Sequence, residues 1–134
     1  MKQGLVLPLV GALWACPMGP SAGSFRPAHS PRGVIATVKF EHSKGQLRGE
    51  LLELRDSTLL LLRDTARVVV VQMRAIRSAS FRNLGTVISH GEMYDSDRER
   101  LRLMSRFPDG LRPEIAAQLL SAYGQTTPDV VTSP

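Results

Sequence analysis

Two short aliphatic runs constrain the fold of this 134-residue chain more than any other feature. They are Leu59 to Leu62 and Val68 to Val71, and only five residues separate them. Short continuous apolar runs bounded by turn residues are typical of strands that are buried on both faces, whereas a sheet with one wet face alternates apolar and polar residues. We therefore expect two neighbouring strands whose outer face is covered by another part of the chain.

The stretch from residue 33 to residue 82 predicts five short strands. Alternation of apolar and polar residues indicates the first strand, and Gly, Asp and Ser residues mark the turns between the strands. The expected strands run from Val34 to Glu41, Leu47 to Arg55, Thr58 to Leu62, Arg67 to Met73 and Ile76 to Phe81.

The second of these strands contains a phase slip. Its apolar positions Leu47, Gly49 and Leu51 alternate, and the apolar set then shifts to Leu52 and Leu54. A shift by one residue is what a β-bulge produces, and bulges supply the bend that a small barrel needs. Gly49 suits a close approach of another backbone segment. The slip therefore predicts a bent strand.

Together these features resemble the Sm-like (SH3-like) small β-barrel. The resemblance is carried by five short strands, by Gly49 in the bent strand, by Asp56 in the following turn, and by Ala75-Ile76 at the last strand. Asp56 follows Gly49 by seven residues instead of the six of the Sm pattern, and the predicted bulge would absorb the additional residue. The resemblance implies a barrel topology.

The resemblance does not extend to RNA recognition. Ser57-Thr58-Leu59-Leu60 stands where the Sm family has the Asn that contacts a base. Gln72-Met73-Arg74 and Ile76-Arg77-Ser78 replace the second RNA-binding motif of the two branches of the family. We therefore do not expect Sm-type RNA binding.

The C-terminal third changes to a helical period. Residues 83–94 are expected to be a connecting loop, within which Thr86 to Ser89 is a candidate sixth strand. Residues 95–124 predict a two-helix hairpin, Asp95 to Arg106 and Pro113 to Tyr123, which would cover the two aliphatic runs. The apolar face of the second helix comprises Leu111, Ile115, Leu119, Leu120 and Tyr123. Residues 125–134 are expected to be a flexible tail. The predicted class is α+β, mainly β, with a five-stranded antiparallel barrel followed by a helical hairpin.

Residues 1–16 have the features of an export signal. Lys2 precedes an apolar run that is too short to span a bilayer, and the run ends in Leu13-Trp14-Ala15-Cys16. This end resembles the lipobox of bacterial lipoproteins, which implies that Cys16 is lipidated and becomes the mature N-terminus. Pro17, in place of the Asp that signals inner-membrane retention, favours the periplasmic face of the outer membrane.

Two other interpretations of the N-terminus stay open. One is an ordinary signal peptide that is cleaved near Ser21-Ala22-Gly23, and the other is a buried N-terminal strand with an incidental cysteine. Residues 17–32 are rich in Pro, Gly and Ser and show neither strand nor helix periodicity, so they predict a tether.

The chain is basic, with a pI of about 10.1 and a formal net charge of +5. Because 14 of the 17 basic residues are arginine, coding composition explains the bias as readily as phosphate binding does. Five arginines are concentrated between residues 63 and 82, and they are either a solvated rim of loops or a contact surface for membrane head groups or lipopolysaccharide. These candidates are Arg63, Arg67, Arg74, Arg77 and Arg82.

No catalytic constellation is found in the sequence. The three histidines lie in separate predicted loops, and His90 with Glu92 lacks a further metal ligand nearby. We therefore expect that the protein is not an enzyme and that it has neither a metal site nor a cofactor. The sequence favours a non-catalytic envelope lipoprotein that carries an interaction or assembly module and binds itself or another envelope protein. The alternative is an Sm-like nucleic-acid-binding protein.

Overall fold

The computed structural model describes residues 32–134, so Cys16, the predicted signal and nearly all of the predicted tether lie outside the described residues. All five predicted strands are present within one or two residues of their expected bounds, and a 3₁₀ turn, η3 (Met73–Ala75), joins the fourth to the fifth. Residues 32–134 are mainly β with two α-helices, as predicted. The strands are β1 (Ile35–Phe40), β2 (Gln46–Leu54), β3 (Thr58–Arg63), β4 (Arg67–Gln72) and β5 (Ile76–Phe81).

Two further strands extend the sheet, so the predicted number of five is wrong. Within residues 83–94, expected to be a connecting loop, the candidate sixth strand Thr86 to Ser89 is confirmed as β6 (Gly85–Ser89), which pairs with β5. Residues 125–134, expected to be a flexible tail, contain β7 (Asp129–Val131), which pairs with β4 in parallel. A three-residue strand is too short to show a periodicity, and its pairing depends on a distant partner. The strand order is β6-β5-β1-β2-β3-β4-β7, and the sheet is open between β6 and β7.

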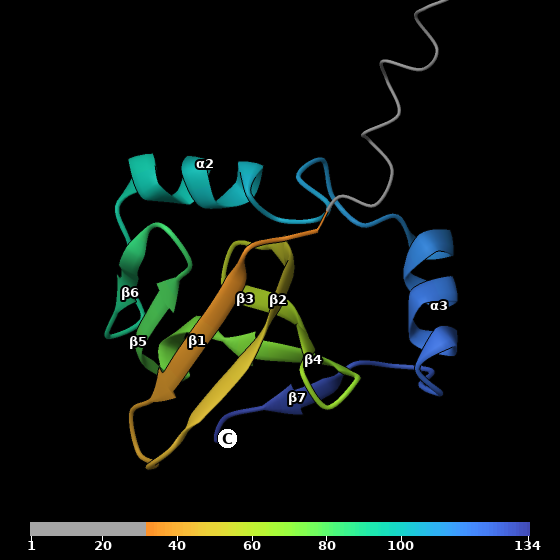
Figure 1. The fold of residues 1–134 in the computed structure, drawn as a ribbon, viewed down its shortest axis with the longest axis horizontal. Helices are drawn as coiled ribbons and strands as arrows, with labels where there is room; N and C mark the ends of the chain where they lie inside the picture. Colours follow the sequence, from red (N-terminus) through yellow and green to blue (C-terminus); the bar gives the residue numbers. More distant parts are fainter. Residues whose placement is uncertain (1–31) are drawn as a thin grey trace, which may run out of the picture. The chain divides into compact units, whose positions relative to one another are not determined.

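The sheet curls around a single main core. Ile88 of β6 and Val131 of β7 contact the same cluster of apolar side chains, although their strands lie at opposite ends of the strand order. Only a strongly curved sheet brings its two ends to one core, and the ribbon shows this curvature (Figure 1). The main core includes Ala36, Val38, Phe40, Leu47, Leu51, Leu59, Leu61, Val69, Val71, Ile76, Phe81 and Leu101.

The predicted β-bulge is confirmed in β2. Leu51 lies opposite Leu61, but Glu53 and not Leu52 lies opposite Leu60, so Leu52 is the additional residue. Leu51 packs in the main core and Leu52 on the opposite side of the sheet, whereas Leu52 and Leu54 were expected to share a face. The bulge therefore directs the side chains of two consecutive leucines to opposite sides of the sheet, each into a different apolar cluster.

The two aliphatic runs are buried on both faces, as predicted. Alternate residues of β3 and β4 enter the main core, and the others form a second cluster on the outer face, which we call the outer cluster. Helix α3 (Pro113–Ala122) covers this cluster with Leu119 and Leu120. The outer cluster consists of Leu52, Leu60, Leu62, Val68, Val70, Phe107, Leu111, Leu119, Leu120 and Tyr123.

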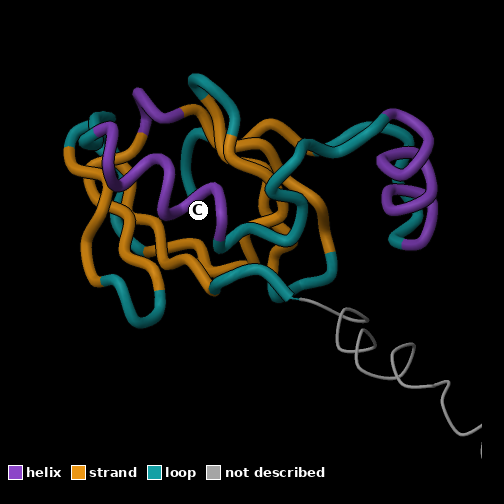
Figure 2. Tube along the Cα trace, turned by 90° about the horizontal axis from the view of Figure 1, so that it is seen from above, coloured by secondary structure: helices purple, strands orange, loops and turns teal. Residues whose placement is uncertain are grey.

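The two helices do not form the predicted hairpin. Helix α2 (Asp95–Leu103) crosses one end of the curled sheet and inserts Leu101 into the main core, while α3 lies apart from it (Figures 1 and 2). The reason lies in the linker: the backbone N–H groups of Arg106 and Phe107 donate to the carbonyls of Leu51 and Leu52. The bulged strand thus holds the linker along the sheet and separates the helices.

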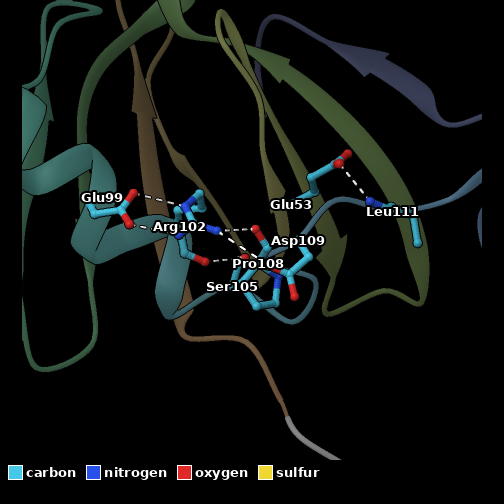
Figure 3. Close-up of polar contacts among 7 residues, drawn as sticks. All are labelled: Glu53, Glu99, Arg102, Ser105, Pro108, Asp109 and Leu111. Atoms are coloured by element: carbon cyan, nitrogen blue, oxygen red, sulfur yellow. Dashed lines mark hydrogen bonds and ion pairs between the residues drawn. The ribbon is translucent and has the colours of Figure 1, made fainter.

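Polar contacts fix this linker on both sides (Figure 3). Arg102 of α2 binds Glu99 within the helix and donates a 2.6 Å hydrogen bond to the carbonyl of Pro108. Glu53 of β2 accepts a 2.8 Å hydrogen bond from the backbone N–H of Leu111. The position of α3 is therefore set by contacts that precede the helix.

Candidate functional site

The five arginines of the predicted anionic contact are distributed over several elements, and two of them, Arg63 and Arg67, lie opposite each other in the pairing of β3 with β4. Arg67 makes two 2.9 Å hydrogen bonds to Asp129, and this pairing lowers the pKa of the Asp129 carboxyl group. Arg74 of η3 donates to Gln72, the last residue of β4, and Arg77 is exposed at the start of β5. Arg82 follows the outward-facing Ser80 by two residues, whereas Arg63 ends β3 opposite Gly49 and Arg67.

The outer side of β5, β1 and β2 is polar and basic. The inward residues Ala36, Val38 and Phe40 of β1 are fully buried, so the residues between them point outward. Thr37 lies between Arg48 of β2 and Ser80 of β5 in the strand register. Helix α3 does not cover this region, because its apolar contacts are to the outer cluster. We call this surface the basic face; it comprises Thr37, Lys39, Gln46, Arg48, Ser78, Ser80 and Arg82, and Arg63 at the end of β3 borders it.

Among the described residues, no carboxylate pairs with the cations of the basic face or with Arg63. Within residues 32–134, neither Lys39 nor any of the three arginines forms an ion pair or a side-chain hydrogen bond. Two adjacent depressions of about 300 and 420 Å³ lie on this surface and share Ile35 and Arg48. Arg63 lines the first and Arg82 the second. Asp64 is the one acidic side chain there besides Glu50.

Glu50 is already occupied by a neighbouring cation. Its carboxylate receives 2.8 and 2.6 Å hydrogen bonds from Arg106 and a 2.7 Å bond from the backbone N–H of Gly33. This arrangement neutralises Glu50 and fixes the start of the described chain beside the first depression. The basic face therefore adjoins the point where the predicted tether ends.

A second polar feature lies at the other end of the curled sheet. The turn Asp56 to Thr58 and the segment Gln72 to Arg74 meet there in a cleft of about 580 Å³. Arg98 of α2 also lines the cleft and donates to the carbonyls of Arg55 and Asp56. The structure thus brings together the turn after β2 and the segment between β4 and β5, and α2 adds a third side.

No protein-family model, curated protein or solved structure matches this chain.

Polar side chains of the described region can bind ligands through charge and hydrogen bonds. Among residues 32–134, no three His, Cys, Asp or Glu side chains gather in a way that would hold a metal ion. His90, named with Glu92 as a conceivable ligand, instead lies 2.8 Å from Glu41. In the same part of the chain, neither helix is long and apolar enough to cross a bilayer. Exposed guanidinium groups next to hydroxyl and amide side chains are suited to binding oxyanions.

The period of two in the strands predicts part of the basic face, although a count of charges along the chain does not. Because Leu47, Gly49 and Leu51 face inward, the period of two already placed Arg48 outward, and the same reasoning placed Lys39 outward in β1. Their proximity to Ser80 and Arg82 depends on the pairing of β1 with β5, which the sequence does not state.

Proposed function

We propose that this protein is a non-catalytic cell-envelope lipoprotein whose small Sm-like β-barrel binds the anionic head groups of the membrane to which Cys16 anchors it. The observation that carries the proposal is a set of cations that have no ion-pair partner within residues 32–134 and lie on a sheet face that α3 does not cover, next to the start of the described chain. The barrel assignment is supported by the order β5-β1-β2-β3-β4 within a curled sheet and by the short η3 turn between β4 and β5.

The proposed lipid anchor and the basic face would contact the same membrane surface. A tether of residues 17–32 spans on the order of 20 Å, so a lipid at Cys16 would keep Arg48, Arg63 and Arg82 within reach of the head groups. Each basic residue near an anionic membrane contributes about 1 kcal/mol of attraction. A lipid chain combined with a basic patch binds a membrane more stably than one signal alone. The basic face would thus fix the orientation of the domain on its membrane.

Labelled palmitate tests the anchor. We expect the full chain to incorporate palmitate in bacterial cells and to fractionate with the envelope, and we expect Cys16→Ser to lose the label. Absence of label from the unchanged chain, together with recovery in the cytosol, would reject the lipoprotein assignment. Label on Cys16→Ser would show that another residue is acylated.

Vesicle binding tests the basic face. In a Cys16→Ser background, the full chain should bind vesicles that contain anionic phospholipid, and Arg48→Glu with Arg82→Glu should weaken binding about thirtyfold or more, because two attractive charges of about 1 kcal/mol each become repulsive. The matched control, Arg74→Glu with Arg77→Glu, changes the net charge equally outside the basic face and should retain most of the binding.

Three outcomes of this experiment are informative. Equal losses in the two double variants would mean that net charge and not the basic face drives binding, and would contradict the proposal. Binding to zwitterionic vesicles reports the contribution of the apolar N-terminus, which all variants share. Binding to lipopolysaccharide but not to anionic phospholipid would identify the outer-leaflet glycolipid as the source of the anionic groups.

The cleft between residues 56–58 and 72–74 supports the alternative function, nucleic-acid binding. Arg74 and Arg98 line it, and the described chain supplies Ser57, Thr58 and Gln72 as hydrogen-bonding groups. RNA binding that falls steeply with salt and is lost in Arg74→Ala would favour this function over the membrane contact. Indifference to RNA at low salt would reject it.

A further inference from the structure

The C-terminal strand differs from every other strand of the sheet. β7 has three residues, and its pairing with β4 is the one parallel pairing among residues 32–134. Its residues Asp129, Val130 and Val131 lie opposite Val69, Val70 and Val71. Parallel pairing is slightly less stable per residue than antiparallel pairing, so such a short strand needs additional contacts to stay on the sheet.

Two side-chain contacts supply this attachment. Gln125, which is only 6% exposed, accepts a 2.8 Å hydrogen bond from the backbone N–H of Val68 and donates a 3.0 Å bond to its carbonyl. Its amide therefore satisfies both backbone groups of Val68, as a neighbouring strand would. Beside it, Asp129 binds Arg67 at the start of β4. Together with β7, these contacts cover the free edge of β4 from residue 67 to residue 71.

The covered edge is suited to pairing with another copy of itself. Strand β4 has the sequence RVVVVQ, so two β4 strands paired antiparallel about Val69 place Val69 opposite Val69, Val68 opposite Val70 and Arg67 opposite Val71. No like charges face each other in this arrangement, and an antiparallel pair of identical strands satisfies twofold symmetry. Exposed aliphatic edge strands are templates for such pairing.

We propose that residues 125–131 are an internal cover that keeps β4 from pairing with β4 of a second copy of this chain. While β7 is in place the protein is a monomer, and when β7 leaves the edge the chain forms a twofold dimer through β4. The edge of β5 is covered independently by β6, so β4 is the edge that can be opened. The β4 edge is distinct from the basic face, so this proposal does not depend on the membrane contact.

The decisive variant removes both side-chain contacts and keeps the chain length. In a Cys16→Ser background, which prevents lipidation and disulfides, Gln125→Ala with Asp129→Arg should convert the monomer to a discrete dimer in size-exclusion chromatography with light scattering. The control, Gln118→Ala with Asp109→Arg, makes the same substitutions at exposed positions and should stay monomeric. An excess of the peptide Gln125 to Pro134 should return the variant to the monomer, because it replaces the missing cover.

A folded variant that stays monomeric at high concentration, with an unchanged circular dichroism spectrum, overturns the proposal. So does a rise in mass that is not a discrete dimer or that the peptide does not reverse. If the double variant does not fold, the single variant Asp129→Arg tests the proposal. Its dimer fraction should exceed that of Asp109→Arg. The charge exchange Arg67→Asp with Asp129→Arg should restore the monomer. A mass equal to that of Asp109→Arg would also contradict the inference.

Discussion

Glu50 and Arg106 join three parts of the chain that the sequence leaves unrelated. Glu50 is the one charged residue among residues 32–134 that is nearly inaccessible, at 8% exposure. It connects β2 to Gly33 before β1 and to Arg106 after α2. A buried carboxylate is tolerated only when its oxygens are satisfied, and the three hydrogen bonds meet this requirement.

We expect Glu50→Ala to lower the free energy of unfolding by about 3 kcal/mol, because it leaves the partly buried Arg106 without its partner and the N–H of Gly33 without an acceptor. Denaturant unfolding followed by circular dichroism measures the loss. Glu99→Ala removes a carboxylate from the solvent-exposed pair with Arg102 and should have a much smaller effect. Equal effects of the two variants would show that Glu50 is not a structural centre.

The sequence predicts the structural role of some residues and not of others. Gly49 was expected to allow a close backbone approach, and a Cβ built there lies 2.6 Å from the carbonyl oxygen of Leu62. The role of Gln125 could not be predicted from the sequence, because its two hydrogen bonds are to the backbone of Val68, which is 57 residues away in the chain. A steric requirement is local and can be inferred, whereas a hydrogen-bond partner is a property of the fold.

At the level of elements, β2 organises both sides of the sheet. Its bulge directs Leu51 into the main core and Leu52 into the outer cluster, and the carbonyls of these residues hold the linker between the helices. The phase slip in the sequence predicted the bulge. It did not predict that the linker would pair with it, and this pairing is why the predicted helical hairpin is absent.

Gly49→Ala should destabilise the protein by about 1–3 kcal/mol, because the added methyl group meets the backbone of β3 and not a movable side chain. The melting temperature measures the change. Arg48→Ala is the control on the same strand, and we expect it to change stability by less than about 0.5 kcal/mol because its side chain is exposed. A melting temperature for Gly49→Ala that matches the control would mean that β2 and β3 separate easily at this point.

The helices show what periodicity can and cannot predict. Of the predicted apolar face of the second helix, Leu111, Leu119, Leu120 and Tyr123 belong to the outer cluster, whereas Ile115 does not. The first helix ends at Leu103, where Leu103 is 60% exposed, and only Leu101 is buried. A stripe indicates that a helix packs against something, but the partner is selected by the rest of the fold.

Across the whole molecule, the C-terminal segment completes the sheet. Helix α3, Gln125 and β7 follow one another along the chain and contact β3 and β4 in turn. The Arg67–Asp129 pair at the end of this segment gives the cover a dependence on pH. Because Arg67 lowers the pKa of Asp129, the stabilisation is complete above the ordinary aspartate value of about 4 and is lost as the pH falls through the lowered value.

The melting temperature of the unchanged chain should therefore exceed that of Asp129→Asn at pH 7, and the difference should shrink toward zero as the pH falls below about 4. Thermal unfolding of both proteins from pH 7 to pH 2.5 measures it. Glu114→Asn, which removes an exposed carboxylate that makes no ion pair within the described residues, controls for the change in net charge. A difference that grows on acidification would contradict the assigned role of Asp129.

The sequence by itself determined the five central strands, the bulge in β2, the double burial of the aliphatic runs and the existence of two helices. Each of these follows from a local pattern or a steric requirement within a few residues. The tertiary structure decided which strands became neighbours, where each helix packed and which cations shared a surface. These outcomes depend on pairings between residues far apart in the chain: Thr37 with Ser80, Leu51 with Arg106, and Val69 with Asp129. Such pairings are selected by burial and by the satisfaction of backbone hydrogen bonds across the whole domain, and no short window of sequence contains both partners.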